Sequence, residues 1–79
     1  MINLVDHIEI NPRILLGKPI IRGTRIPVEL IVKLIAQEWT HAEILKEYPS
    51  LKQEDIKAAL LYAEKALEEE EIFSFGINQ

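Results

Sequence analysis

Apolar residues recur at helical spacing in two segments of the chain. In residues 27–38, leucine or isoleucine occupies positions 30, 31, 34 and 35, and in residues 51–71 an apolar stripe runs from Ile56 to Leu67. Because residues three and four apart share one face of a helix, both segments predict helices that bury one side. Pro27 fits the first helical position of the earlier segment.

Capping residues predict a third, shorter helix between these two. Thr40 and Glu43 have the spacing of a capping box, in which each side chain accepts a hydrogen bond from the other residue's backbone N–H. Trp39 and Ile44 flank this box and can pack together as a hydrophobic staple. Pro49 disfavours helical backbone at the preceding residue, so this helix should end after about two turns.

The last helix has weaker boundary signals. Ser50 and Gln53 offer a second box, so we expect this helix to begin at Ser50 or Leu51 and to end near Glu71. Its final turn, from Glu68 to Glu71, places four negative charges where the helix dipole prefers cations. This end of the helix is therefore expected to fray.

Proline and glycine interrupt the first 26 residues, which predict an extended arm. Residues 8–10 alternate apolar and polar side chains, as in a strand. Residues 13–16 and 19–22 are mainly apolar runs on either side of Gly17-Lys18, a pattern that indicates a hairpin with a type II′ turn. Since Pro19 cannot donate a hydrogen bond to a neighbouring strand, this hairpin should be an edge structure.

Together these elements predict one mainly α-helical domain over residues 1–79. It comprises the hairpin arm (residues 1–26), a three-helix unit (residues 27–71) and an apolar tail (residues 72–79). A short helix, a proline-containing turn and a longer helix have the order of a helix-turn-helix. A domain this small buries only about 60% of its unfolded surface, so we also expect it to gain stability as a homodimer.

Composition excludes several classes of protein. The chain has no cysteine, which rules out a disulfide framework and fits a reducing compartment. Its N-terminus lacks the features of a signal peptide, and no apolar run approaches the roughly 20 residues that cross a bilayer. The sequence therefore predicts a cytoplasmic protein without membrane contact.

No group of residues has the pattern of an active site. Gly17, Gly23 and Gly76 are isolated, so there is no phosphate-binding loop. His7 and His41 lack acidic neighbours at the spacing of metal ligands. We expect neither enzymatic activity nor a metal or other cofactor.

The net charge of −4 hides an asymmetry along the chain. Residues 1–37 carry five basic and three acidic side chains, whereas residues 38–79 carry four basic and ten acidic ones. This segregation indicates two surfaces with different partners, or simply an acidic solvated helix after a slightly basic arm. Arg22 and Arg25, with Lys18, are candidates for contacts to DNA phosphates or to a minor groove. The alternative is that the two arginines pair with acidic residues of the same chain, or that Arg25 helps to hold the start of the first helix.

The helix-turn-helix order adds a second set of candidates for DNA contact. The exposed start of the last helix would enter the major groove, where Gln53 can read adenine. Lys52 and Lys57 can contact phosphate or guanine. Glu54 and Asp55 oppose this role, because their charges would repel the DNA backbone.

The C-terminal tail is a candidate partner-binding segment. Phe73, Phe75 and Ile77 alternate as in a strand, which can add to the sheet edge of a partner. Glu70 and Glu71, just before them, would steer the tail toward a basic partner such as a nuclease active site. The alternative is that the two phenylalanines fold back and close the protein's own core.

A long motif in the arm, GKPIIRGTRIPV, occupies Gly17–Val28. With further matches on both sides, it makes residues 8–63 resemble the bacterial and archaeal domain-of-unknown-function family 433. The resemblance implies a homeodomain-like helical core and, for many members, an antitoxin that neutralises a PIN-like ribonuclease by direct binding. The other matching residues are Ile10-Asn11-Pro12, Ile44-Leu45, Tyr48–Leu51, Glu54–Leu60 and Tyr62-Ala63.

We therefore expect the antitoxin of a type II toxin–antitoxin system, which binds its toxin and also its operator DNA. Two alternatives stay open: a stand-alone helix-turn-helix transcriptional regulator, and a dimerisation module that binds no DNA.

Two positions depart from the family pattern. Glu38 stands where the family usually has glycine, and a left-handed backbone there would cost a non-glycine residue about 1 kcal/mol, so we expect this turn to differ from the family's. Lys52 stands where threonine or serine is usual, which weakens the cap of the last helix.

Overall fold

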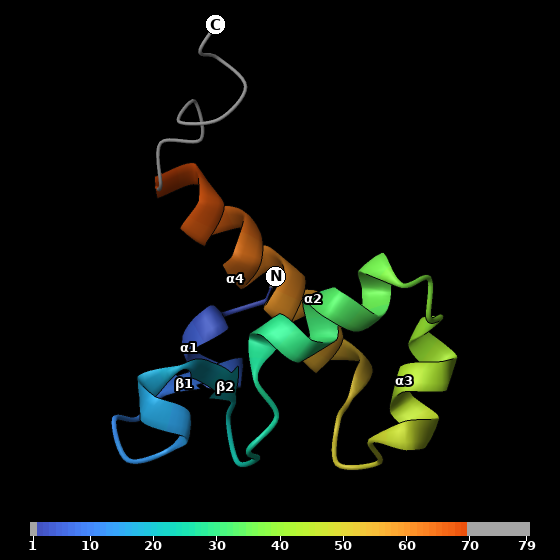
Figure 1. Cartoon of the computed structure of the whole chain (residues 1–79), viewed down its shortest axis with the longest axis horizontal. Helices are drawn as coiled ribbons and strands as arrows, with labels where there is room; N and C mark the ends of the chain where they lie inside the picture. Colours follow the sequence, from blue (N-terminus) through green and yellow to red (C-terminus); the bar gives the residue numbers. More distant parts are fainter. Residues whose placement is uncertain (1, 70–79) are drawn as a thin grey trace, which may run out of the picture.

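A computed structural model describes residues 2–69 of the chain. In Figure 1, α4 crosses the molecule, with α1 and the two strands on one side of it and α3 on the other. The mainly helical fold with a two-stranded antiparallel hairpin near the N-terminus agrees with the sequence prediction. The elements, in chain order, are α1 (Leu4–His7), β1 (Ile8–Ile10), the 3₁₀ turn η1 (Leu15–Gly17), β2 (Pro19–Ile21), α2 (Val28–Ala36), α3 (His41–Glu47) and α4 (Gln53–Glu69).

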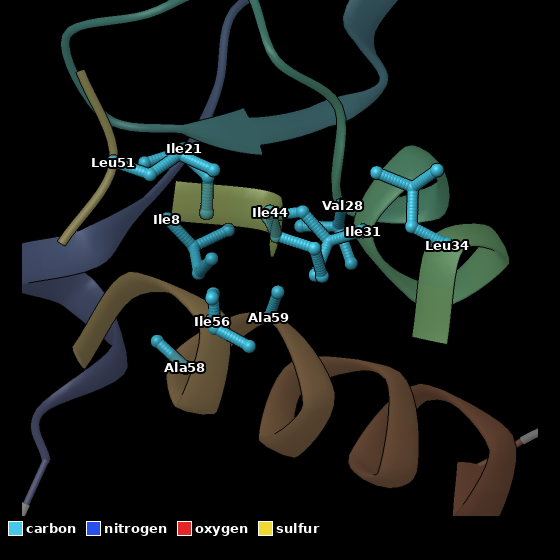
Figure 2. Packing of buried hydrophobic residues seen from close by; sticks show 10 residues of the cluster. All are labelled: Ile8, Ile21, Val28, Ile31, Leu34, Ile44, Leu51, Ile56, Ala58 and Ala59. Carbon is cyan, nitrogen blue, oxygen red and sulfur yellow. The ribbon is translucent and has the colours of Figure 1, made fainter. Parts of the chain in front are cut away.

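One hydrophobic core joins the arm to the helices. Ile21, Ile31, Ile44 and Ile56 come from four different elements, and each is at most 1% exposed. Figure 2 shows the core side chains meeting between α2, α4 and the hairpin. Complete burial of such a side chain stabilises the fold by about 1.5–3 kcal/mol, so these residues hold the arm against the helices.

The hairpin uses a different first strand from the predicted one. Residues 19–21 are a strand as expected, but they pair with β1, and the predicted strand over residues 13–16 is wrong. The reason is local: the Asn11 side chain accepts a hydrogen bond from the N–H of Arg13 (2.9 Å), which starts a turn. Three left-handed residues follow in η1, with φ from 48° to 82°. This longer connection replaces the predicted turn at Gly17-Lys18.

The helix α1 has no counterpart in the sequence prediction, which treats residues 1–26 as extended. Four residues are too few to show a helical period. The local signal is Asn3, whose side chain caps the helix by accepting a hydrogen bond from the N–H of Val5 (3.1 Å). Asparagine is among the residues most favoured at this capping position.

The helix α2 lies where the apolar spacing predicts it, with Pro27 at the capping position just before it. It ends in a Schellman motif. The N–H of Glu38 donates to the carbonyl of Ile35 (2.9 Å), and the N–H of Trp39 donates to the carbonyl of Leu34 (3.0 Å). Glu38 has a φ of 71°, so it adopts the left-handed conformation that glycine would favour.

The start of α3 confirms the predicted capping box. The N–H of Glu43 donates to the Thr40 hydroxyl (3.1 Å), and the N–H of Thr40 donates to the Glu43 carboxylate (2.7 Å). The helix ends at Glu47, before Pro49, as predicted.

The start of α4 differs from the prediction. Leu51 is buried in the core and precedes the helix, which begins at Gln53. The predicted box of Ser50 and Gln53 is replaced by a hydrogen bond from the N–H of Lys52 to the carboxylate of Asp55 (2.9 Å). The predicted end of this helix, near Glu71, lies outside the described residues.

Replacing Glu38 with glycine should stabilise the protein. Glycine adopts the left-handed conformation without the Cβ contact, so Glu38→Gly should raise the free energy of unfolding by about 1 kcal/mol. In a domain of this size the melting temperature should rise by roughly 4–8 °C, as thermal unfolding followed by circular dichroism would show. Glu38→Ala is the matched control, because it removes the carboxylate but keeps the Cβ. An equal gain in both variants would assign the effect to charge and contradict the backbone explanation.

Candidate functional site

The loop after β2 holds Arg25 in a fixed place. Thr24 closes the loop, since its hydroxyl donates to the carbonyl of Ile21 (2.7 Å) and accepts from the N–H of Ile26 (3.0 Å). The N–H of Ile21 also donates to the carbonyl of Ile26 (2.9 Å), which joins the two ends of the loop. Arg25 lies between Thr24 and Ile26 and is exposed. Its guanidinium is therefore accessible on a loop whose backbone is held by hydrogen bonds.

Arg22 lies on the same loop but contacts the backbone of the arm. Its Nε donates to the carbonyl of Val5 and its Nη2 to the carbonyl of Ile8, both at 3.1 Å. Arg22 is thus bonded within the chain, but to backbone carbonyls and not to the acidic side chains that the sequence suggested, while a contact to DNA remains a prediction. Lys18 also has a partner: its Nζ lies 2.8 Å from the Glu29 carboxylate, an exposed pair of little energetic weight.

A buried carboxylate fastens the arm to the start of α4. Asp55 is 8% exposed, and its Oδ1 lies 2.9 Å from Nδ1 of His7. Its Oδ2 accepts a hydrogen bond from the N–H of Lys52, and its own N–H donates to the Lys52 carbonyl, each at 2.9 Å. The expectation that Asp55 would face DNA and repel it is therefore wrong, because the carboxylate points into the protein.

The loop before α4 and the first two turns of this helix present the other predicted DNA-contacting residues. Lys52, Gln53 and Lys57 are all exposed. The Nε2 of Gln53 lies 2.6 Å from Nδ1 of His41, so α3 helps to orient the Gln53 amide. Glu54 is exposed beside them and lowers the positive charge of this turn.

The structure brings the loop that carries Arg25 and the loop that carries Lys52 to one side of the molecule, whereas Lys18 lies beside the second half of α4. In Figure 1, the loop between β2 and α2 and the loop between α3 and α4 lie along the same edge. Ile21 and Leu51, at the inner ends of the two loops, lie close together in the core (Figure 2). We call this edge, with Arg25, Lys52 and Gln53 as its central residues, the basic edge.

A second surface, which the sequence did not predict, lies between the arm and the last turns of α4. A groove of about 450 Å³ opens there, and most of its lining is apolar. The predicted partner-binding residues Glu70, Glu71, Phe73, Phe75 and Ile77 lie outside the described residues. The groove is lined by Leu4, Val5, Ile8, Ile10, Tyr62, Lys65, Ala66 and Glu69.

Two features of other classes of protein are absent from the described part of the chain. Residues 2–69 contain no cluster of three or more side chains that could hold a metal ion. No helix within this range is long and apolar enough to span a membrane.

The fold and these surfaces define a small, mainly helical protein with an N-terminal hairpin. The chain belongs to the family described as "Protein of unknown function (DUF433)", whose pattern matches residues 8–63. The family resemblance expected from the arm motif is thus confirmed.

The chain is similar to one uncharacterised protein and to one solved structure. It is 41% identical over 54 residues to "Uncharacterized protein y4eO" of Sinorhizobium fredii, a match that covers 68% of this chain and 24% of that protein. A crystal structure of a DUF433 member from Anabaena variabilis is 39% identical, with a TM-score of 0.76 over 84% of this chain and 65% of that chain. The chain therefore spans about a quarter of the length of the first relative and less than two thirds of the second.

Removing the Asp55 carboxylate should destabilise the fold strongly. Asp55→Ala leaves the His7 ring and the N–H of Lys52 without their acceptor, which should cost about 2–3 kcal/mol of unfolding free energy in urea titrations. His7→Ala removes one of the two bonds and should cost about 1 kcal/mol. Glu54→Ala, one position away and exposed, should stay within about 0.5 kcal/mol of the wild type. Similar losses in Asp55→Ala and Glu54→Ala would contradict this role of the buried carboxylate.

Proposed function

We propose that this protein is the antitoxin of a toxin–antitoxin pair, which neutralises a PIN-like ribonuclease by binding it and also binds the operator DNA of its own gene. The observation that carries the proposal is the separation of two surfaces. The basic edge lies on the loops after β2 and α3, and the apolar groove lies beside the last turns of α4. Two separate surfaces suit a protein that contacts nucleic acid and a protein partner.

The DNA-binding part of the proposal rests on the first turn of α4. We propose that α2, α3 and α4 form a homeodomain-like unit in which the start of α4 enters the major groove. Gln53 would contact a base, while Lys52 and Lys57 would contact phosphate or guanine. Arg25, on its braced loop, would reach the neighbouring backbone, and a dimer would place two such units on a two-fold operator.

The toxin-binding part rests on the charge of the other end of the protein. Glu64, Glu68 and Glu69 make the exposed face of the last turns of α4 acidic. The active site of a ribonuclease binds phosphates and is expected to attract such a surface. The tail that continues from α4 adds two more glutamates and the apolar residues that would anchor the contact.

Binding to the DNA upstream of its own gene should depend on the basic edge. The protein should bind this duplex more tightly than a scrambled one, and its affinity should fall steeply with salt because phosphate contacts release counterions. Lys52→Ala with Arg25→Ala should weaken binding and reduce the slope of log affinity against log salt by about 2. Fluorescence anisotropy across a salt series measures both quantities.

Lys65→Ala is the matched control, since Lys65 is exposed on the part of α4 that lines the groove. It should leave both the affinity and the salt slope unchanged. Equal affinity for the two duplexes at every salt concentration would refute the DNA-binding part of the proposal.

Neutralisation of the toxin should require the tail. Co-expression with the ribonuclease-like product of a neighbouring gene should restore growth, and a chain cut after Glu71 should lose this rescue, since the apolar anchor is gone. The double variant Arg25→Ala with Lys52→Ala should rescue growth fully, because it alters only the DNA surface. Full rescue of growth by the truncated chain would contradict the proposed role of the tail in binding the toxin. Operator binding without any rescue by the complete chain would favour a stand-alone regulator.

A further inference from the structure

The second half of α4 extends beyond the core. Its buried residues end at Ala59, whereas Tyr62, Ala63 and Ala66 are only half-buried. Figure 1 shows the last turns of α4 projecting past the other helices. The apolar stripe of this helix therefore continues for two turns with no described element covering it fully.

The groove beside these turns leaves large apolar side chains accessible to water. Val5 is 69% exposed and Ile10 is 58% exposed, and both line the groove opposite Tyr62 and Ala66. A single exposed apolar residue is ordinary, but several along one groove favour an apolar occupant, because covering them removes their surface from water.

The chain itself carries a segment with the matching chemistry. The ten residues after Glu69 include Ile72, Phe73, Phe75 and Ile77. Alternation puts Phe73, Phe75 and Ile77 on one side of an extended segment. Such a segment could therefore place three large apolar side chains against one surface.

The connection between the tail and the groove is short. Glu69, the last described residue of α4, itself lines the groove. Ten extended residues reach about 33 Å, which allows the chain to reverse and run back along α4 toward Ile10. Lys65 also lines the groove and has the opposite charge to Glu70 and Glu71, where the tail begins.

We propose that the groove between α1, β1 and the last turns of α4 is the docking site for the protein's own C-terminal segment, with Phe73 and Phe75 seated against Val5, Ile10 and Ala66. Covalent attachment makes this docking intramolecular, so it does not depend on protein concentration. The seated tail removes the apolar side chains of the groove from water in the free protein. A partner that takes the tail must then compete with the groove for the same residues.

This inference does not require the proposed function. Docking within one chain involves neither toxin nor DNA, so it can be tested on the free protein. Failure of the antitoxin proposal would leave it intact, and its own failure would leave both partner-binding proposals intact.

The test is a methyl NMR comparison of the full chain with the double variant Phe73→Ser and Phe75→Ser. Seated rings should shift the methyl resonances of Val5, Ile10 and Ala66, and the double variant should lose these shifts. In the wild type, nuclear Overhauser contacts should join the phenylalanine ring protons to the same methyl groups. Ile31 and Ile44, in the core, should keep their positions in the variant and so verify its folding.

Ser74→Ala is the matched control, because alternation in an extended segment would put Ser74 on the side opposite Phe73 and Phe75, so this variant should leave the groove resonances unchanged. Groove resonances that are identical in wild type and double variant, without ring contacts, would overturn the proposal. Ring contacts that appear between chains in a mixture of labelled and unlabelled protein, or shifts that grow with concentration, would assign the groove to a second copy and would also overturn it.

Discussion

The arrangement of this small protein depends on where one carboxylate is buried. A charged carboxylate away from water is costly unless hydrogen bonds compensate it, and both oxygens of Asp55 have close partners. One partner is the backbone before α4 and the other is His7 at the end of α1, so the same side chain caps the last helix and fastens the arm to it. The register of the arm against α4 follows from this contact, because Ile8 and Ile21 then lie over Ile56 and Ala59 in the core (Figure 2).

The separation of the two surfaces follows from the same contact. With the arm fixed at the start of α4, the loop that carries Arg25 lies on the same edge as Lys52 and Gln53 (Figure 1). The other half of α4 then extends past the hairpin, where the arm leaves a groove instead of a packed interface. Different parts of α4 thus contribute to the basic edge, to the core and to the groove.

The sequence predicted the features that short-range rules control. The Thr40–Glu43 box, the end of α3 before Pro49 and the buried faces of α2 and α4 depend on neighbours a few residues apart. Glu38 stands where the family has glycine, and we expected a different turn there, but the backbone keeps the left-handed conformation. The hairpin was placed wrongly because two apolar runs around a glycine resemble two strands, while the left-handed run in η1 leaves no local signal at the two leucines before Gly17.

The sequence likewise predicted some residues of the candidate surfaces and missed others. Residue type and helix order identified Arg25, Lys52, Gln53 and Lys57, and the structure leaves all four exposed. The sequence could not show that Asp55 turns inward, since its partner His7 is 48 positions away. An acidic residue three positions after the helix cap was the one local signal for its role. The sequence also could not predict the groove, because Val5 and Ile10 come together with Tyr62 and Ala66 only when the arm packs against α4.

The basic edge should therefore bind DNA without any contribution from the groove at the other end of α4. Amide hydrogen exchange of the protein, alone and with the duplex from upstream of its gene, tests this claim most directly. DNA should slow exchange in residues 22–27 and in residues 49–57, and should leave exchange in residues 62–69 and in the arm residues 4–10 unchanged. Protection by DNA that falls on α1, β1 and the last turns of α4, with none on the two loops, would contradict it.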